Sequence, residues 1–248
     1  EQGSWSGSPQ RFGAAGAILV GDLMLGWSSE IFGAALLNSP NPAVEEACRN
    51  EFSHMRVEVM AGQYLDVVEE NAGATRPVSE AVARANQVML YKTAKYSIEA
   101  PLLIGAAFAG ADSTARRDLS DFGIPLGLAF QLKDDILGVF GDPVVTGKPA
   151  GDDLREGKRT VLIALTREAL SDLVGKEFDK MMSTRDLSSS QIGMLQQTIR
   201  GSGALGRTES LMNQLADSAL GKLETLKIDE ASRKALTALA RKVVNRDS

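Results

Sequence analysis

Apolar residues recur at helical spacing from Leu119 to Phe140, and the tripeptide Gly141-Asp142-Pro143 then ends the pattern. Glycine and alanine are plentiful along the chain, and the alternation of β-branched residues that strands favour is nearly absent. A length of 248 residues with 44% hydrophobic residues suits one globular domain with a sizeable core. The sequence therefore predicts a single all-α domain.

Polar and charged residues are concentrated at the end of this helix and in the segment that follows it. Gln131, Asp134 and Asp135 lie three and four residues apart, so they share one helix face. Adjacent carboxylates on an otherwise apolar helix are costly without a nearby cation. Mg²⁺ suits this pair, because it is usually held by one or two carboxylates together with phosphate oxygens of a substrate.

A Gly/Pro-rich segment then supplies Lys148 and Lys158, two point charges suited to the same phosphates. These residues predict a magnesium-diphosphate site. The alternative is a solvated helix end and loop, in which the charges have no ligand.

The run FQLKDDILGVFGDPVVTGKPAGDDLREGKRT, residues 130–160, resembles the second aspartate-rich region of the trans-polyprenyl diphosphate synthases, which include farnesyl and geranylgeranyl diphosphate synthases. Three further segments resemble this family in the same order: GDLML, GQYLD and YKT. The resemblance implies an isoprenoid-synthase-type bundle of about ten helices around a central cavity. Residues 1–248 would form one polyprenyl synthase domain that lacks its N-terminal helices, because the family's first DDxxD motif is absent from them.

The resemblance also assigns the site residues. It implies catalytic roles for a group of polar residues on several helices: Lys92, Thr93, Gln131, Lys148 and Lys158. It implies substrate binding by a partly overlapping group: Gln63, Asp66, Lys92, Gln131, Lys148 and Lys158. An ammonium on the departing diphosphate and oxygen dipoles near a carbocation are the chemistry that such residues offer.

Asp134, Asp135 and Asp153 are the metal-site residues that the resemblance implies. We expect Asp134 to bind magnesium directly and Asp135 to orient the site. Asp152 is an alternative to Asp153. The family's pattern is usually DDxxD, whereas this sequence has Gly138 at the fifth position and so lacks the third carboxylate.

The activity that the resemblance implies is transfer of an allylic prenyl group onto isopentenyl diphosphate, with magnesium as cofactor and a product of farnesyl or geranylgeranyl length. The alternative is a noncatalytic homologue that binds and modulates an active synthase, since the first motif and the carboxylate at position 138 are absent. A terpene cyclase on the same bundle is a third interpretation, which the paired lysines disfavour.

Composition limits the kinds of binding partner and the cellular compartment that we expect for this chain. A net charge of −5 without a basic stripe argues against nucleic acid. Cys48 is the single cysteine, which excludes an internal disulfide and favours the cytoplasm. The uncharged runs fall short of the ~18 apolar residues of a membrane span, so we expect no transmembrane segment.

The apolar segment between Arg11 and Leu37 carries many small residues and only one acid in its apolar part, Asp22. We expect Asp22 to be buried with a hydrogen-bond partner on a neighbouring helix. The family resemblance, together with these small residues, predicts a homodimer. The absence of an initiator Met suggests a fragment, a processed chain or part of a longer protein.

Overall fold

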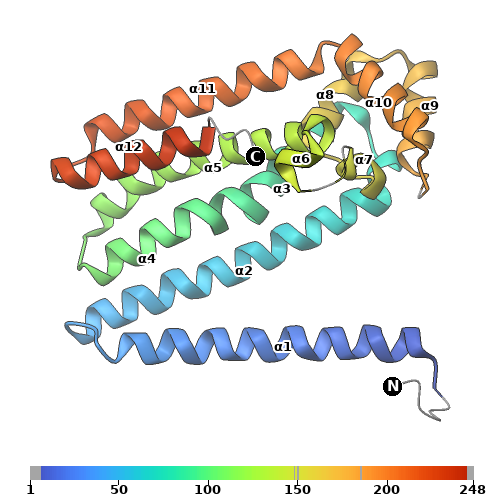
Figure 1. Ribbon diagram of the computed structural model, residues 1–248. Coiled ribbons are helices and arrows are strands. Elements are labelled where there is room, and N and C mark those ends of the chain that lie inside the picture. Colours follow the sequence, from blue (N-terminus) through green and yellow to red (C-terminus); the bar gives the residue numbers. More distant parts are fainter. Residues whose placement is uncertain (1–6, 148, 150, 185, 245–248) are drawn as a thin grey trace.

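The computed structural model describes residues 7–147, 149, 151–184 and 186–244 and is helical throughout its regular structure (Figure 1). Within these residues there are twelve α-helices, two 3₁₀ helices and one π-helix, η3. In chain order they are α1 (Pro9–Leu36), α2 (Pro42–Ala72), η1 (Gly73–Thr75), η2 (Val78–Glu80), α3 (Ala81–Val88), η3 (Met89–Glu99), α4 (Ala100–Phe108), α5 (Ser113–Phe140), α6 (Pro143–Thr146), α7 (Asp152–Glu156), α8 (Val161–Ala169), α9 (Asp172–Met182), α10 (Ser189–Gly201), α11 (Ala204–Thr225) and α12 (Glu230–Val244).

This architecture confirms the predicted all-α fold. There are more helices than the expected ten or so, because the segment after Gly141 contains the separate short helices α6 and α7. Local chemistry explains the helix boundaries. The Asn41 side chain caps α2 by accepting from the Val44 N–H, and Asp112 caps α5 by accepting from Ala115. The helix α5 ends at Phe140, before the predicted break.

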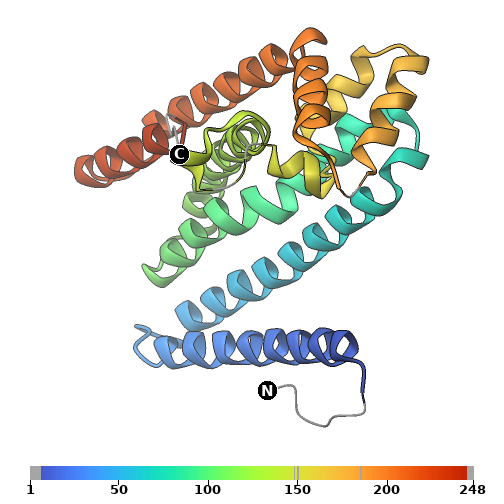
Figure 2. The same ribbon diagram turned by 45° about the vertical axis from the view of Figure 1, so that its right-hand side comes forward.

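The central helix is α5, which packs mainly against α11 and η3, and η3 in turn packs against α2 (Figure 1). Its side chains Phe122, Leu126 and Leu132 are fully buried. The largest cluster of buried apolar residues joins the C-terminal half of α5 to α8, α10 and α11. Figure 2 shows the short helices α7 to α10 gathered at one end of the bundle. Burial of these apolar faces holds the end of α5 in the middle of the molecule.

The helix η3 has a wide π-helical turn at the predicted Lys92-Thr93 pair. Glycines on both sides allow its backbone to approach its neighbours closely. A Cβ on Gly62 of α2 would overlap the Lys92 backbone, and a Cβ on Gly127 of α5 would overlap Ala94. π-helical turns occur frequently at functional sites, and this one lies where α2 and α5 converge.

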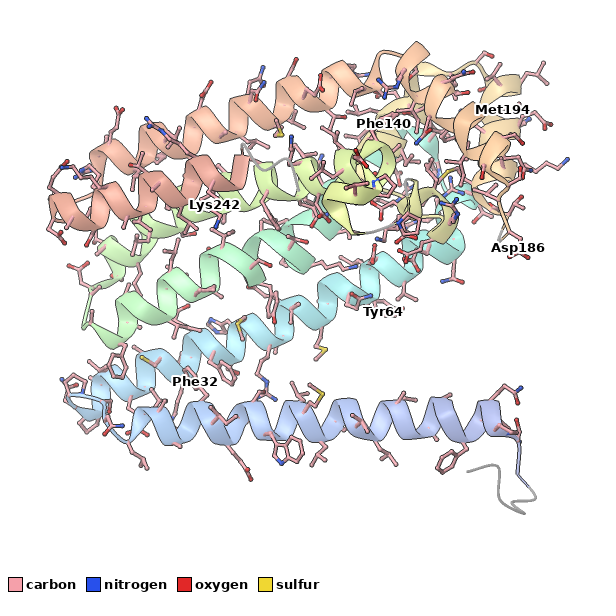
Figure 3. All side chains as sticks on the ribbon, in the orientation of Figure 1. Phe32, Tyr64, Phe140, Asp186, Met194 and Lys242 are labelled. Atoms are coloured by element: carbon pink, nitrogen blue, oxygen red, sulfur yellow. The ribbon has the colours of Figure 1, made fainter. Side chains whose placement is uncertain are left out.

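The first helix, α1, lies along one side of the molecule and diverges from the other helices towards its N-terminal end (Figures 1 and 2). It meets α2 near its C-terminal end, where Phe32 stacks on Phe52 with ring centroids 4.0 Å apart (Figure 3). The Arg56 guanidinium also donates to Ser29 across this contact at 2.7 Å. The prediction of a buried Asp22 was wrong: Asp22 is exposed, because no other described helix packs on that part of α1.

By length and composition, α1 is the one helix of the described residues that could cross a membrane. Its apolar stretch does not form one long uncharged run, because Asp22 interrupts it between Arg11 and Glu30. The expectation that the chain has no transmembrane segment is therefore not confirmed.

Candidate functional site

A cavity of about 140 Å³ lies where α2, α3, η3, α5, α7 and the start of α8 meet. Eight of the predicted site residues line it: Asp66, Lys92, Thr93, Gln131, Asp134, Asp135, Asp153 and Lys158. Gln63 is exposed on α2 and is not among the lining residues, so its role stays a prediction. Lys148 lies outside the described residues. The fold thus brings predicted site residues that lie up to 92 positions apart in the sequence, Asp66 and Lys158, around one cavity.

A chain of hydrogen bonds connects η3 to the aspartates of α5. The Thr93 hydroxyl donates to Gln131 Oε1 at 2.7 Å, and Gln131 Nε2 donates to Asp135 Oδ1 at 2.8 Å. A longer bond of 3.4 Å joins Gln131 Nε2 to Asp134. These contacts fix which end of the Gln131 amide faces η3, so its carbonyl oxygen lies beside Thr93 and its N–H groups face the carboxylates.

The two aspartates of α5 have different environments. Asp134 is partly exposed and lines the cavity, whereas Asp135 is only 4% exposed. Burial raises the pKa of Asp135 to about 8, although the bond from Gln131 opposes the rise, and the nearby Asp153 and Asp134 carboxylates add to it. This concentration of negative charge favours a bound cation, and Asp134 offers the more accessible carboxylate.

Asp153 reaches the two aspartates of α5 from the short helix α7. A Cβ on Gly138 would overlap the Asp153 carboxylate, so the missing side chain at position 138 makes room for Asp153. A carboxylate from a different helix thus lies against position 138, where the DDxxD pattern would have its third carboxylate. Burial raises the pKa of Asp153, and its bond from Lys158 opposes that rise.

The backbone of α7 explains how Lys158 returns to Asp153. Gly157 adopts a left-handed conformation with φ 71°, which favours glycine, and it ends α7 after five residues. Lys158 Nζ then donates to Asp153 Oδ1 at 2.6 Å and lies 2.9 Å from Glu156 Oε2. Burial alone would lower the pKa of Lys158, but the bonds to these two carboxylates outweigh it and raise that pKa. Lys158 is therefore a firmly charged cation beside the acids.

Lys92 provides a second cation on the opposite wall. Its ammonium group contacts the Asp66 carboxylate of α2 and stays about one-third exposed. Asp66 is itself largely buried. The structure brings these two predicted polar residues of α2 and η3 together at one cavity, although they lie 26 positions apart in the sequence.

The carboxylates fit a magnesium ion that completes its coordination with other oxygens. No group of three or more His, Cys, Asp or Glu side chains within the described ranges is positioned to hold a metal by itself. Asp134, however, faces the cavity beside buried acids, and Mg²⁺ commonly takes one or two carboxylates and leaves further positions for water or phosphate. The donor set suits such a shared site better than a complete protein cage.

A model of the family described as polyprenyl synthetase matches residues 3–198. This chain is a member of the polyprenyl synthetase family. The match covers every predicted site residue, and the structural comparisons below agree with the predicted isoprenoid-synthase-type fold.

Two relatives show the extent of the similarity in sequence. The geranylfarnesyl diphosphate synthase of Aeropyrum pernix is 36% identical over 155 residues, which are 60% of this chain and 46% of that protein. The (2E,6E)-farnesyl diphosphate synthase of Mycobacterium tuberculosis is also 36% identical over 155 residues, 62% of this chain and 40% of that protein. The chain thus spans about half the length of the curated relatives it matches.

Solved structures resemble this chain over nearly all of its length. A geranylgeranyl pyrophosphate synthase from Corynebacterium glutamicum, complexed with isoprenyl diphosphate and magnesium, is 37% identical with a TM-score of 0.88, covering 98% of this chain and 66% of that one. A Caulobacter crescentus polyprenyl synthase, complexed with calcium and isoprenyl diphosphate, is 29% identical with a TM-score of 0.78, covering 96% and 68% of the two chains.

The sequence patterns did not identify every residue of the cavity. Arg159 and Thr160 also line the cavity, and Glu156 shares Lys158 with Asp153. All three lie within the aspartate-rich stretch, so their position in the sequence was a usable signal. Spacing alone could not show the Thr93 to Gln131 bond, which joins residues 38 positions apart.

Proposed function

We propose that the protein is a magnesium-dependent trans-prenyltransferase, which condenses an allylic diphosphate with isopentenyl diphosphate to give a longer trans-prenyl diphosphate. The observation that carries this proposal is the cavity in which four aspartates, two lysines and the Thr93–Gln131 pair meet. We further propose a product of farnesyl or geranylgeranyl length, because several of the similar proteins are named as synthases of these products, whereas the Aeropyrum pernix relative is named for the longer geranylfarnesyl product.

Asp134 is the residue that would hold magnesium most directly, with Asp135 and Asp153 beside it. Magnesium, when bound, supplies positive charge that stabilises a departing diphosphate. Gln131 holds the Asp135 carboxylate through its N–H group, and Lys158 holds Asp153. These contacts orient the acids before substrate arrives, so little reorganisation is needed during the reaction.

The chain's own residues stabilise both charges that the reaction develops. When the allylic C–O bond breaks, the bonding electrons leave with the diphosphate, whose negative charge Lys92 and Lys158 stabilise. The carbonyl oxygen of Gln131 and the hydroxyl oxygen of Thr93 place partial negative charge where the allylic cation forms. The isopentenyl double bond then supplies the electrons of the new C–C bond, and loss of a proton completes the transfer.

Apolar side chains from three elements line the same cavity: Val88 from α3, Met89 from η3 and Val161 from α8. Their role in this proposal is to exclude water, which would otherwise capture the carbocation. One of the two observations that favoured a noncatalytic modulator was the missing carboxylate at position 138. That observation is weaker now, because the Asp153 carboxylate lies against Gly138. No comparison names such a modulator among the relatives reported above.

We also propose that the protein is a cytoplasmic homodimer whose contact includes α1. Large apolar side chains are exposed along this helix, among them Ile18, Leu19, Leu23, Met24 and Trp27. Exposed apolar patches of this kind mark interaction surfaces. Cys48 is buried and free of any disulfide, which supports a reducing compartment.

The test is a turnover assay of the full-length protein with isopentenyl diphosphate and each allylic diphosphate from dimethylallyl to geranylgeranyl, with magnesium and with chelator. We expect elongation only with magnesium, and the longest product reports the depth of the prenyl pocket. If folded full-length protein gives no product with any primer, the proposal is wrong and the modulator interpretation takes its place.

A further inference from the structure

A second, smaller cavity lies next to the catalytic one, between the end of α2, the start of α3, and helices α8 and α9. Its volume is about 30 Å³, room for two or three water-sized groups. Arg159 lines both cavities, but the aspartates of α5 and both catalytic lysines line only the larger one. The smaller cavity is therefore a neighbour of the catalytic cavity with its own set of polar residues.

Four guanidinium groups and only two carboxylates line this cavity. The cations come from the residue after η1, from α3, from the residue before the N-cap of α8 and from α8 itself: Arg76, Arg84, Arg159 and Arg167. Glu69 and Asp179 are the two acids. Arginines therefore outnumber carboxylates by two in this lining, although the chain as a whole has a net charge of −5.

Each acid is shared by two arginines. Glu69, whose side chain is 7% exposed, accepts from Arg84 at 2.9 Å and from Arg76 at 2.6 Å. Asp179 accepts from Arg159 and from Arg167, both at 2.7 Å. These contacts hold the guanidinium groups in place in the absence of any ligand, so the cavity is preorganised.

Three of the four arginine side chains are almost buried: Arg84 is 10% exposed, Arg159 11% and Arg167 12%. Glu80 also lies 3.5 Å from Arg84, but its side chain is 60% exposed and it does not line the cavity. Excess buried positive charge is costly unless an anion balances it. The cavity therefore favours an anionic ligand.

The shape and chemistry of the lining select the kind of anion. Guanidinium groups recognise phosphate through paired N–H donors, and several converge here from different elements. The small volume admits one tetrahedral group and excludes a prenyl chain or a nucleoside. Val78, Ala81, Ile163 and Ala164 complete the wall with apolar atoms, which strengthen electrostatic contacts by keeping water out.

We propose that this arginine cavity binds a single phosphate group, as free inorganic phosphate or as one end of inorganic diphosphate, independently of metal. Its ligand is thus separate from the diphosphates that the proposed prenyl transfer places at Asp134. Because Arg159 immediately follows Lys158 and precedes Thr160, the N-cap of α8, an occupied cavity also holds the backbone that presents Lys158.

Isothermal titration of the full-length protein with inorganic phosphate, in chelator, tests this proposal. We expect one saturable site per chain and a dissociation constant raised about tenfold or more by Arg76→Gln, since one charge-assisted hydrogen bond is lost. Arg76 is partly exposed, so this variant should stay folded. The matched control is Arg49→Gln on α2, which also removes an exposed arginine paired with a glutamate and should leave the affinity unchanged.

Two further variants separate this site from the catalytic cavity. Ala81→Leu keeps all four arginines but fills part of the arginine cavity, and it should weaken phosphate binding as Arg76→Gln does. Asp134→Ala should leave phosphate binding unchanged. A parallel titration with inorganic diphosphate in chelator shows which of the two sources binds more tightly.

The proposal is overturned if wild-type protein shows no saturable phosphate or diphosphate binding without metal, if Arg76→Gln binds as tightly as wild type, or if Asp134→Ala abolishes binding. None of these results depends on prenyl transfer, because the titrations need no turnover.

Discussion

The catalytic cavity and the helix α1 differ in how far contacts within the chain account for their residues. At the cavity, the polar side chains from η3, α5 and α7 each have a partner: Thr93 bonds to Gln131, Gln131 to the aspartates of α5, and Lys158 to Asp153. Along α1, Trp27 is 52% exposed and Ile31 71% exposed, although both are large apolar residues.

This difference shows which region is stabilised by contacts within the described chain and which region is not. The arrangement of the cavity follows from buried helices whose apolar faces pack against one another. The composition of α1 demands a partner that the described helices do not supply, since only its C-terminal end packs against α2. A second copy of the protein is the partner that we propose.

The largest effect on turnover is expected at the catalytic cavity. Asp134→Ala removes the most accessible carboxylate of the cavity, and we expect turnover to fall by about 10²- to 10³-fold, as for loss of other charge-stabilising groups. Steady-state kinetics with saturating magnesium measure this. Asp121→Asn is the matched control on the same helix, because Asp121 pairs with Lys222 at the surface and should be dispensable. Near-wild-type turnover of Asp134→Ala would remove the aspartates from the mechanism.

Gly138→Ala should have the next largest effect, because its Cβ would displace the Asp153 carboxylate. We expect the magnesium concentration needed for half-maximal turnover to rise about 10- to 100-fold, the usual effect of disturbing groups around a metal. Magnesium titrations of turnover measure the change. Gly193→Ala on α10 is the control, since its Cβ meets no atom within 4 Å. An unchanged magnesium requirement in Gly138→Ala would show that Asp153 does not serve the metal.

Thr93→Val should have a smaller effect, because it removes one hydroxyl while it keeps the shape of the side chain. The Gln131 carbonyl oxygen then loses its donor, and we expect a fall in kcat of about tenfold, with circular dichroism unchanged. Thr198→Val on α10 removes a hydroxyl that bonds only to its own helix and should be neutral. Equal kcat values for Thr93→Val and wild type would contradict a role for this hydrogen-bond chain.

The smallest effect on folding is expected at α1. Trp27→Glu should change the free energy of unfolding of a single chain by less than about 0.5 kcal/mol, since the side chain is exposed, but it should convert the proposed dimer to a monomer. Sedimentation and denaturant titration measure the two quantities. Leu173→Glu, at an exposed position of α9, should leave the mass unchanged. A Trp27→Glu protein with the wild-type mass would exclude this face as the dimer contact.

Local pattern predicted much of the central region. Helical spacing correctly placed Gln131, Asp134 and Asp135 on one face of α5, and turn residues correctly ended that helix. The approach of α7 to α5 could not be predicted in this way, because the effect of Gly138 depends on a carboxylate 15 positions later in the chain. The same applies to the arginine cavity, whose cations are spread from Arg76 to Arg167.

Pattern was least informative for α1. Its apolar residues suit a buried helix, a membrane span and a subunit contact equally, and Asp22 was wrongly expected to be buried. Periodicity reports which face of a helix is apolar, but it does not report what covers that face.

The most direct test of prenyl transfer is to follow inorganic diphosphate release and prenyl product together, in full-length wild type and Asp134→Ala, with geranyl diphosphate and isopentenyl diphosphate. We predict one diphosphate released for each isopentenyl unit added by wild type, only with magnesium, and a loss of both signals in Asp134→Ala. Magnesium-independent elongation, or equal elongation by a folded Asp134→Ala protein, would contradict the assignment of the cavity as the prenyltransferase site.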